Sequence, residues 1–200
     1  MASTLETLMG QLGGSTLQNL SSQLGTDPNQ TQSGVAAALP LLLGALTRNS
    51  QTSSGASALN NALDRDHDGS ILDDVTGFLA QGDTSTGSGI LKHVLGAKQS
   101  RVESGLSQGT GLSGESAGKL LALLAPLVLG ALGKTKKEKG MDASALAGYL
   151  GHEREEVEKR APQQMGVLNV LLDSDGDGDV DLSDIAKQGG GLLGKLFGQG

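Results

Sequence analysis

Two long apolar runs, divided by short polar and glycine-rich stretches, dominate the pattern of hydrophobic and polar positions. Residues 34–46 read GVAAALPLLLGAL, and residues 120–133 read LLALLAPLVLGALG. The runs are 13 and 14 residues long, against the roughly 20 residues that cross a bilayer. Both are therefore predicted to be buried helices, and a membrane span is disfavoured. Because no stretch alternates apolar and polar residues as a half-buried strand would, the pattern predicts an all-α protein.

Capping residues place the starts of three helices. Ser3 and Glu6 form an S-x-x-E pattern, in which each side chain accepts a hydrogen bond from a backbone N–H of the first turn. Asp27, directly before Pro28, is expected to cap the first apolar helix, and Ser113 has the corresponding place before the second. These local signals favour helices along the whole chain.

The chain contains an internal repeat. LPLLLGAL at residues 39–46 returns as APLVLGAL at 125–132, 86 residues later. Pro40 and Pro126, within these copies, are expected to kink a helix or to start a new one because proline removes a backbone donor. Further matches follow in the same order: ASALNNAL (56–63) with ASALAGYL (143–150), LNNALDRDHDG (59–69) with LNVLLDSDGDG (168–178), and GSGILKHVLG (87–96) with GGGLLGKLFG (189–198).

A tandem duplication accounts for these matches. We expect an N-terminal helix over residues 1–19, repeat one over 20–104 and repeat two over 105–200, joined as one compact pseudo-twofold unit. Repeat two carries an insertion, HEREEVEKRAPQQMGV, that repeat one lacks.

Each repeat holds a twelve-residue segment rich in aspartate. The second aspartate loop, residues 173–184, reads DSDGDGDVDLSD. An EF-hand loop supplies oxygen ligands from positions 1, 3, 5, 7, 9 and 12 and has glycine at position 6, and Gly178 is that glycine here. The expected ligands are Asp173, Asp175, Asp177, the backbone carbonyl of Asp179, Asp181 and Asp184.

The first aspartate loop, residues 64–75, reads DRDHDGSILDDV and keeps only the first part of this pattern. Its twelfth residue is Val75, so Asp73 or Asp74 would have to complete the ligand shell, with an exit helix that starts about one residue early. A surface turn without an ion is the alternative. The expected ligands are Asp64, Asp66, Asp68, the backbone carbonyl of Ser70, Asp73 and Asp74.

The charge distribution agrees with cation binding. The two loops hold 11 of the 22 acidic residues of a chain whose formal net charge is −7. So many neighbouring carboxylates repel one another unless a cation neutralises them. Calcium is the expected ion, and magnesium is the alternative because the closing Asp184 is shorter than the usual glutamate.

Other chemistry finds little support. The chain has no cysteine, which excludes disulfides and thiolate metal sites, and no nucleophile motif, HExxH, P-loop or dinucleotide fingerprint. We therefore expect no enzymatic activity. The basic segment KTKKEK, residues 134–139, is interpreted as the solvated end of a helix, with anionic lipid or nucleic acid as the alternative partner.

DNA binding is the competing hypothesis. Residues 143–160 have a spacing like a helix-turn-helix, with a candidate recognition helix at 153–160. Four glutamates on that helix make it a poor surface for phosphates, so a nucleic-acid partner is disfavoured.

Three of the quoted segments carry a family resemblance. LPLLLGAL, ASALNNALDRDHDGSILDD and GSGILKHVLG resemble the bacterial proteins of domain of unknown function family 937, which are distantly similar to YidB-like proteins. The resemblance implies a bacterial helical protein and supplies no catalytic residue.

The sequence as a whole predicts a calcium-binding, non-enzymatic structural or interaction module. The alternative is an ion-independent scaffold or a DNA-associated protein. The partner is an unknown protein or a second copy of the chain. The N-terminus has no signal-peptide pattern, so a cytoplasmic location is the default and secretion without a leader stays open.

Overall fold

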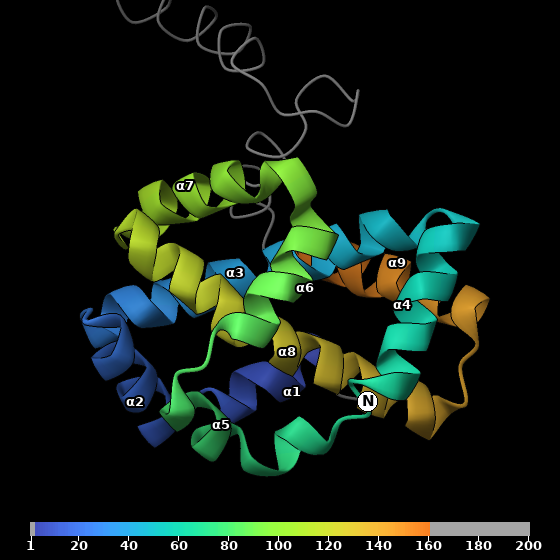
Figure 1. Cartoon of the computed structure of the whole chain (residues 1–200), viewed down its shortest axis with the longest axis horizontal. Coiled ribbons are helices and arrows are strands. Elements are labelled where there is room, and N and C mark those ends of the chain that lie inside the picture. Colours follow the sequence, from blue (N-terminus) through green and yellow to red (C-terminus); the bar gives the residue numbers. More distant parts are fainter. Residues whose placement is uncertain (1–2, 161–200) are drawn as a thin grey trace, which may run out of the picture. The chain divides into compact units, whose positions relative to one another are not determined.

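Every regular element between residues 3 and 160, the part of the chain that the computed structural model describes, is a helix. The prediction of an all-α protein is thus confirmed for these residues, and Met1–Arg160 form a unit of their own (Figure 1). In chain order the elements are α1 (Thr4–Gln11), α2 (Ser15–Leu24), α3 (Pro28–Ser50), α4 (Ser53–Arg65), the 3-10 helix η1 (Ser70–Asp74), α5 (Val75–Gln81), α6 (Ser85–Leu95), the 3-10 helix η2 (Gly96–Lys98), α7 (Gln99–Thr110), α8 (Gly114–Lys139) and α9 (Ala143–Arg160).

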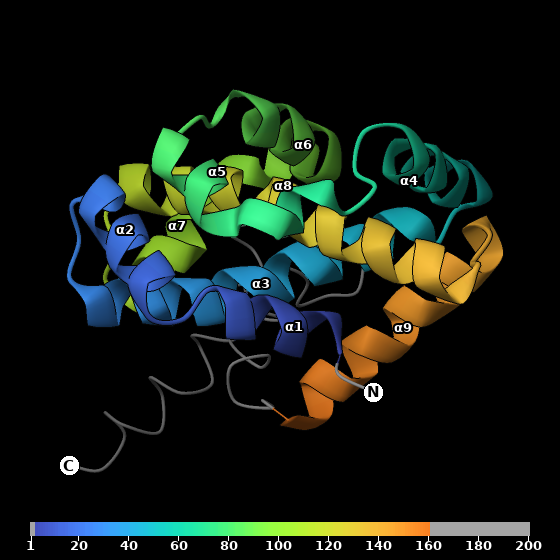
Figure 2. The ribbon, with the colours of Figure 1, turned by 90° about the horizontal axis from the view of Figure 1, so that it is seen from below.

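Helix α8 is the centre of this unit. It contacts α1, α3, α4, α6, α7 and η1, which surround it on several sides (Figures 1 and 2). Every residue from Leu120 to Gly133 is buried. The apolar run at 120–133 is therefore a core helix whose leucines face neighbours in all directions, as a helix that is apolar all round requires.

The predicted helix starts are confirmed. Ser3 and Glu6 form the reciprocal capping box at α1. Asp27 caps α3 by accepting a hydrogen bond of 2.8 Å from the backbone N–H of Asn29, and Ser113 caps α8 by accepting one of 3.0 Å from Ser116. These signals succeed because a cap depends only on residues within one turn.

Two local details differ from the simplest prediction. Pro40 and Pro126 each lie inside one continuous helix and do not start a new one. The segment before residue 19 contains two helices, α1 and the start of α2, where one was expected. The break falls at Gly13-Gly14, where Gly14 has a φ of 60°, a backbone conformation that glycine adopts without steric cost.

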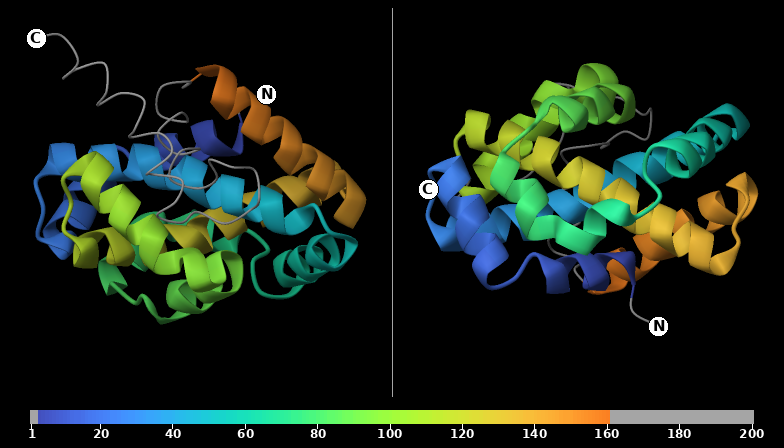
Figure 3. Two further views of the ribbon diagram at one scale, coloured as in Figure 1. Left: turned by 90° about the horizontal axis from the view of Figure 1, so that it is seen from above. Right: turned by 60° about the horizontal axis from the view of Figure 1, so that its bottom comes forward.

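Helices α3 and α8 lie side by side and run in the same direction (Figure 2). Glycine allows their close approach: a Cβ atom on Gly34 would lie 2.7 Å from side-chain atoms of Leu112 and Leu120. Helix α6 also lies tightly on α8, since a Cβ atom on Gly87 would be 1.7 Å from the carbonyl oxygen of Ala122. Helices α1, α2, α4, α7 and α9 pack against this group, and α5 packs against α2 (Figure 3).

Candidate functional site

The first aspartate loop connects α4 to η1 and α5. Helix α4 ends at Arg65, and Gly69, at the sixth position of the loop, has a φ of 100°. A side chain at Gly69 would be strained by this φ and would also meet Lys134 of α8, whose Cβ is 2.7 Å from the position of an added Cβ. The loop therefore turns directly on the surface of α8.

Apolar residues anchor the loop on the central helix. Leu72 and Val75 are buried, and a Cβ atom on Gly130 of α8 would lie 2.4 Å from Cγ2 of Ile71. The eighth position of the loop thus contacts α8, whereas in paired EF-hands it contacts a neighbouring loop. Farther along α8, the carbonyl oxygen of His67 would lie 1.8 Å from a Cβ atom on Gly133.

Four carboxylates of this loop bind groups of the protein itself. Asp64 forms an ion pair with Lys136 of α8 and accepts a hydrogen bond from Asn60. Asp66 pairs with Arg65 at 2.9 Å. Asp68 accepts a hydrogen bond of 3.0 Å from the backbone N–H of Ser70, and Asp74 accepts one of 2.8 Å from Gly77.

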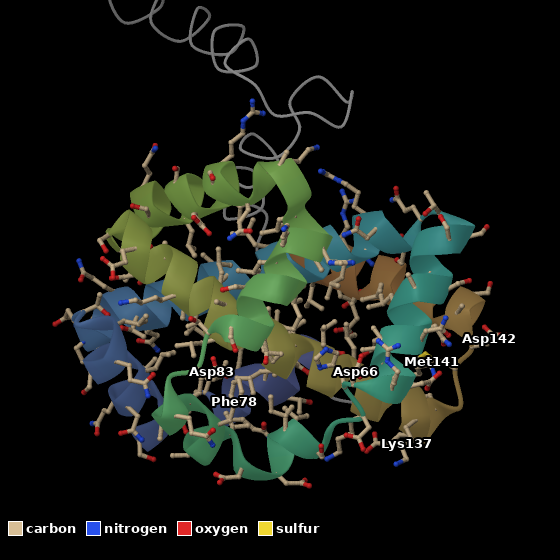
Figure 4. All side chains as sticks on the ribbon, in the orientation of Figure 1. Asp66, Phe78, Asp83, Lys137, Met141 and Asp142 are labelled. Atoms are coloured by element: carbon tan, nitrogen blue, oxygen red, sulfur yellow. The ribbon has the colours of Figure 1, made fainter. Side chains whose placement is uncertain are left out.

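These partners come from different parts of the fold, namely α8, the end of α4, η1 and α5. Asp66 lies at the end of α4, where Arg65 is its neighbour (Figure 4). Asp74 caps α5, which begins at Val75 and not earlier, and Asp73 is exposed. Helix α5 therefore does not start early, as completion of the ligand shell would require. Between residues 3 and 160, no group of three or more His, Asp or Glu side chains is placed to hold a metal ion.

The same partners change the acidity of two carboxyls. The hydrogen bond from Arg65 lowers the pKa of Asp66, and hydrogen bonds from Ser70 lower the pKa of Asp68. Burial lowers the pKa of His67, whose side chain is half-buried. The carboxyls of Asp66 and Asp68 are thus more acidic than ordinary aspartates.

Lys136 is the residue that sequence reasoning missed. The segment 134–139 was expected to be the solvated end of a helix, and α8 indeed ends there with basic residues in its last turn. The side chain of Lys136, however, is only 10% exposed and points to Asp64, whose side chain is 58% exposed. Nothing local in the sequence predicts this pair, because 72 residues separate its members.

The second aspartate loop, with Asp173, Asp175, Asp177, Asp179, Asp181 and Asp184, lies outside the described residues. Its assignment stays a prediction. The helix-turn-helix hypothesis can be compared with the structure, because α9 runs as one helix from Ala143 through Gly151 to Arg160. The turn that would separate a recognition helix from its support is absent at these positions.

A family model described as a bacterial protein of unknown function (DUF937) matches residues 6–135. The chain belongs to the DUF937 family. No curated protein and no solved structure matches it. The matched part of this DUF937 member contains the first aspartate loop and ends one residue before Lys136. The more distant similarity to YidB-like proteins stays a prediction.

Helix α8 of this DUF937 protein is the one helix within the described part that is long and apolar enough to cross a membrane. Its most apolar window is 89% buried by the rest of the unit. Packing inside the protein accounts for its apolar character.

Proposed function

We propose that this DUF937 protein is a non-enzymatic structural or interaction module, built by tandem duplication, that binds calcium through its second aspartate loop. The first aspartate loop is its weaker counterpart, because cations of the protein compete there for the carboxylates. The observation that carries the proposal is the left-handed Gly69 at position six of an aspartate-rich loop between two helices.

Helix ends support the duplication. Helices α2 and α7 both end at a left-handed glycine, Gly25 and Gly111, which are 86 residues apart. The caps of the following helices, Asp27 and Ser113, have the same separation. A duplicated helix pair predicts such an equal separation in sequence, both at the end of the first helix and at the start of the second.

Contacts between the two halves support a twofold relation. Gln30 donates a hydrogen bond of 3.2 Å to the carbonyl oxygen of Gly111, at the end of α7. Its counterpart Ser116 donates one of 3.2 Å to the carbonyl oxygen of Leu24, at the end of α2. Gly34 contacts Leu120, its own counterpart 86 residues later, as positions near a twofold axis do.

The backbone of the first aspartate loop supports an EF-hand-like course for this type of segment. An EF-hand requires a helix, a sharp turn at a glycine in position six and a second helix. Helix α4, Gly69 and η1 with α5 follow in that order. The backbone N–H of Ser70 donates a hydrogen bond to the carboxylate of Asp68, and this bond tightens the same turn.

The difference between the loops supports their unequal affinity. In the first loop the ammonium of Lys136 neutralises Asp64 at the first ligand position, and Arg65 binds Asp66 at the third. An incoming cation must displace both. In the second loop the residues at the places of Arg65 and His67 are Ser174 and Gly176, which carry no charge.

Calorimetric titration of the full chain with calcium, and separately with magnesium, tests the proposal. Asp175→Asn and Asp66→Asn are matched substitutions, because each changes position three of one loop. We expect the tighter calcium site to weaken by about tenfold or more in Asp175→Asn, since one ligand charge is lost. Asp66→Asn leaves that site unchanged, and Lys136→Met strengthens the weaker site.

Absence of heat with calcium at millimolar concentration would sink the proposal. Size-exclusion chromatography and thermal unfolding, each with and without chelator, separate the two kinds of role. If chelator changes the oligomeric state as well as the melting temperature, the ion regulates an interaction. If neither quantity changes, the chain is an ion-independent scaffold and calcium binding is excluded as its function.

A further inference from the structure

An apolar pocket lies between α4 and α6, away from the first aspartate loop. Its volume is about 520 Å³, within the range typical of small-molecule sites. Both helices pack against α3 and α8 (Figure 1). Leu46 of α3 and Leu129 of α8 line the pocket between them. Its walls and floor come entirely from described residues.

The walls are helix faces of the kind that soluble proteins bury. On α4 the lining residues include Gly55, Ala58 and Ala62, which recur at helical spacing. On α6 they include Ile90 and Val94, one turn apart and each half-buried. Such an i, i+3, i+4, i+7 pattern normally meets a partner surface. The small residues of α4 leave that surface hollow.

One glycine in the wall has no packing reason within the described unit. A Cβ atom on Gly87 of α6 would collide with the backbone of α8, so that glycine is needed for the fold. At Gly89, one of the lining residues, an added Cβ would meet no atom within 4 Å. Glycine inside a helix costs about 0.5–1 kcal/mol relative to alanine, and here the cost maintains open space.

The lining determines the chemistry of an occupant. No Lys, Arg, Asp or Glu lines the pocket, so a charged ligand would lose its hydration without gaining an ionic partner. Polar groups come only from Asn49, Thr86 and His93. Asn49 donates a hydrogen bond of 2.8 Å to the carbonyl oxygen of Val94, which ties α3 to the end of α6 beside the pocket. This hydrogen bond holds α3 and α6 together at that edge of the pocket.

We infer that the pocket between α4 and α6 binds an uncharged, largely apolar small molecule. The inference does not rest on the first aspartate loop, because no residue between 64 and 75 lines the pocket. The ligand places its apolar body against Leu46, Leu129 and Ile90. A single polar group, where the ligand has one, meets Thr86 or His93.

Titration of the full chain with the neutral fluorescent probe N-phenyl-1-naphthylamine tests this inference. We expect saturable binding with one probe per chain. Gly89→Leu fills the pocket and weakens binding by about tenfold or more, equivalent to at least about 1.4 kcal/mol. Gly148→Leu is the matched control, because Gly148 is also an exposed helical glycine whose added Cβ meets no atom within 4 Å, and it leaves probe affinity unchanged.

Both substitutions replace a glycine inside a helix and are expected to preserve folding, which circular dichroism and thermal unfolding verify. Two results overturn the inference: the wild-type chain shows no saturable probe binding, or Gly89→Leu binds the probe as the wild type does. If, in the second case, Gly89→Leu also alters the oligomeric state in light scattering, the pocket belongs to an interface between copies of the chain.

Discussion

Helices α3 and α8 carry nearly the same eight-residue segment, but the described residues cover them to different extents. In α8 the first aspartate loop lies over Gly130 and Gly133, which are buried beneath Ile71 and His67. In α3 the aligned Gly44 is half-buried, and an added Cβ there would meet no atom within 4 Å. The helix sequence alone therefore does not determine burial.

The difference comes from the segments that succeed each helix along the chain. Helix α3 is succeeded by α4, the first aspartate loop and α6. The loop and α6 lie mainly on α8, whereas α4 packs against both α3 and α8. The sequence counterpart of that covering segment, residues 168–198, lies outside the described residues. Comparing substitutions at aligned positions of α3 and α8 measures how much the cover contributes to stability.

The largest effect is expected at Gly133. Alanine there would place its Cβ 1.8 Å from the backbone carbonyl oxygen of His67, which no side-chain rotation can relieve. We expect Gly133→Ala to lower the free energy of unfolding by about 3 kcal/mol, because the loop must move away from α8. Thr47, the aligned residue of α3, already carries a side chain, whose hydroxyl donates to the carbonyl oxygen of Leu43 at 2.8 Å.

Urea unfolding of Gly133→Ala beside Gly148→Ala, an exposed glycine of α9, provides the measurement. A loss no greater than in the control would mean that the loop is not held against α8 at this point. The comparison of the two helices would then fail at its most tightly packed position.

The next largest effect is that alanine is expected to change stability in opposite directions at the aligned positions Gly130 and Gly44. Gly130→Ala places a Cβ 2.4 Å from Cγ2 of Ile71, a β-branched side chain with little freedom to rotate. We expect a loss of about 1–3 kcal/mol of stability. Gly44→Ala meets open space and should stabilise by up to about 1 kcal/mol, because alanine favours a helix.

Thermal and urea unfolding of the full-length variants decide this prediction. If both substitutions destabilise to the same degree, α3 is covered at Gly44 as closely as α8 is at Gly130. Helices α3 and α8 would then differ in how far they are covered only within the part of the chain that the structure describes.

Local signals were predictable from the sequence, and contacts between distant segments were not. The caps Ser3, Asp27 and Ser113 were placed correctly because their partners lie within four residues. The approach of Gly87 to Ala122 depends on how two helices cross, and no periodicity encodes it. The pairing of Lys136 with Asp64 is of the same kind.

The candidate site shows the same limit. The aspartate pattern at 64–75 correctly indicated a turn with glycine at its sixth position. It could not show that Arg65 and a lysine of another helix would occupy the carboxylates, because ligand patterns describe oxygens and not competing cations.

The smallest effect concerns the C-terminal end of α8, which α9 follows along the chain as α4 follows α3. Tyr149 of α9 lies under the ammonium of Lys139, which is 4.3 Å from the ring centroid, and its hydroxyl is 2.8 Å from Oγ1 of Thr4. Ala62 has the aligned place in α4 and makes no such bond. Tyr149→Phe keeps the ring and removes the hydrogen bond between its hydroxyl and Thr4, so we expect a loss of about 1 kcal/mol at pH 7.

The same substitution changes the response to alkali. Burial raises the pKa of Tyr149 above its ordinary value of 10.0, so the folded chain holds the phenol proton more tightly than the unfolded chain does. Above pH 10 the unfolded state loses this proton first, and stability falls as the pH rises through the folded pKa. Tyr149→Phe should lack this loss, and Thr4→Val, which removes the hydrogen bond but keeps the phenol, should retain it. Equal alkaline unfolding profiles for the two variants would show that Tyr149 does not contribute to the pH dependence.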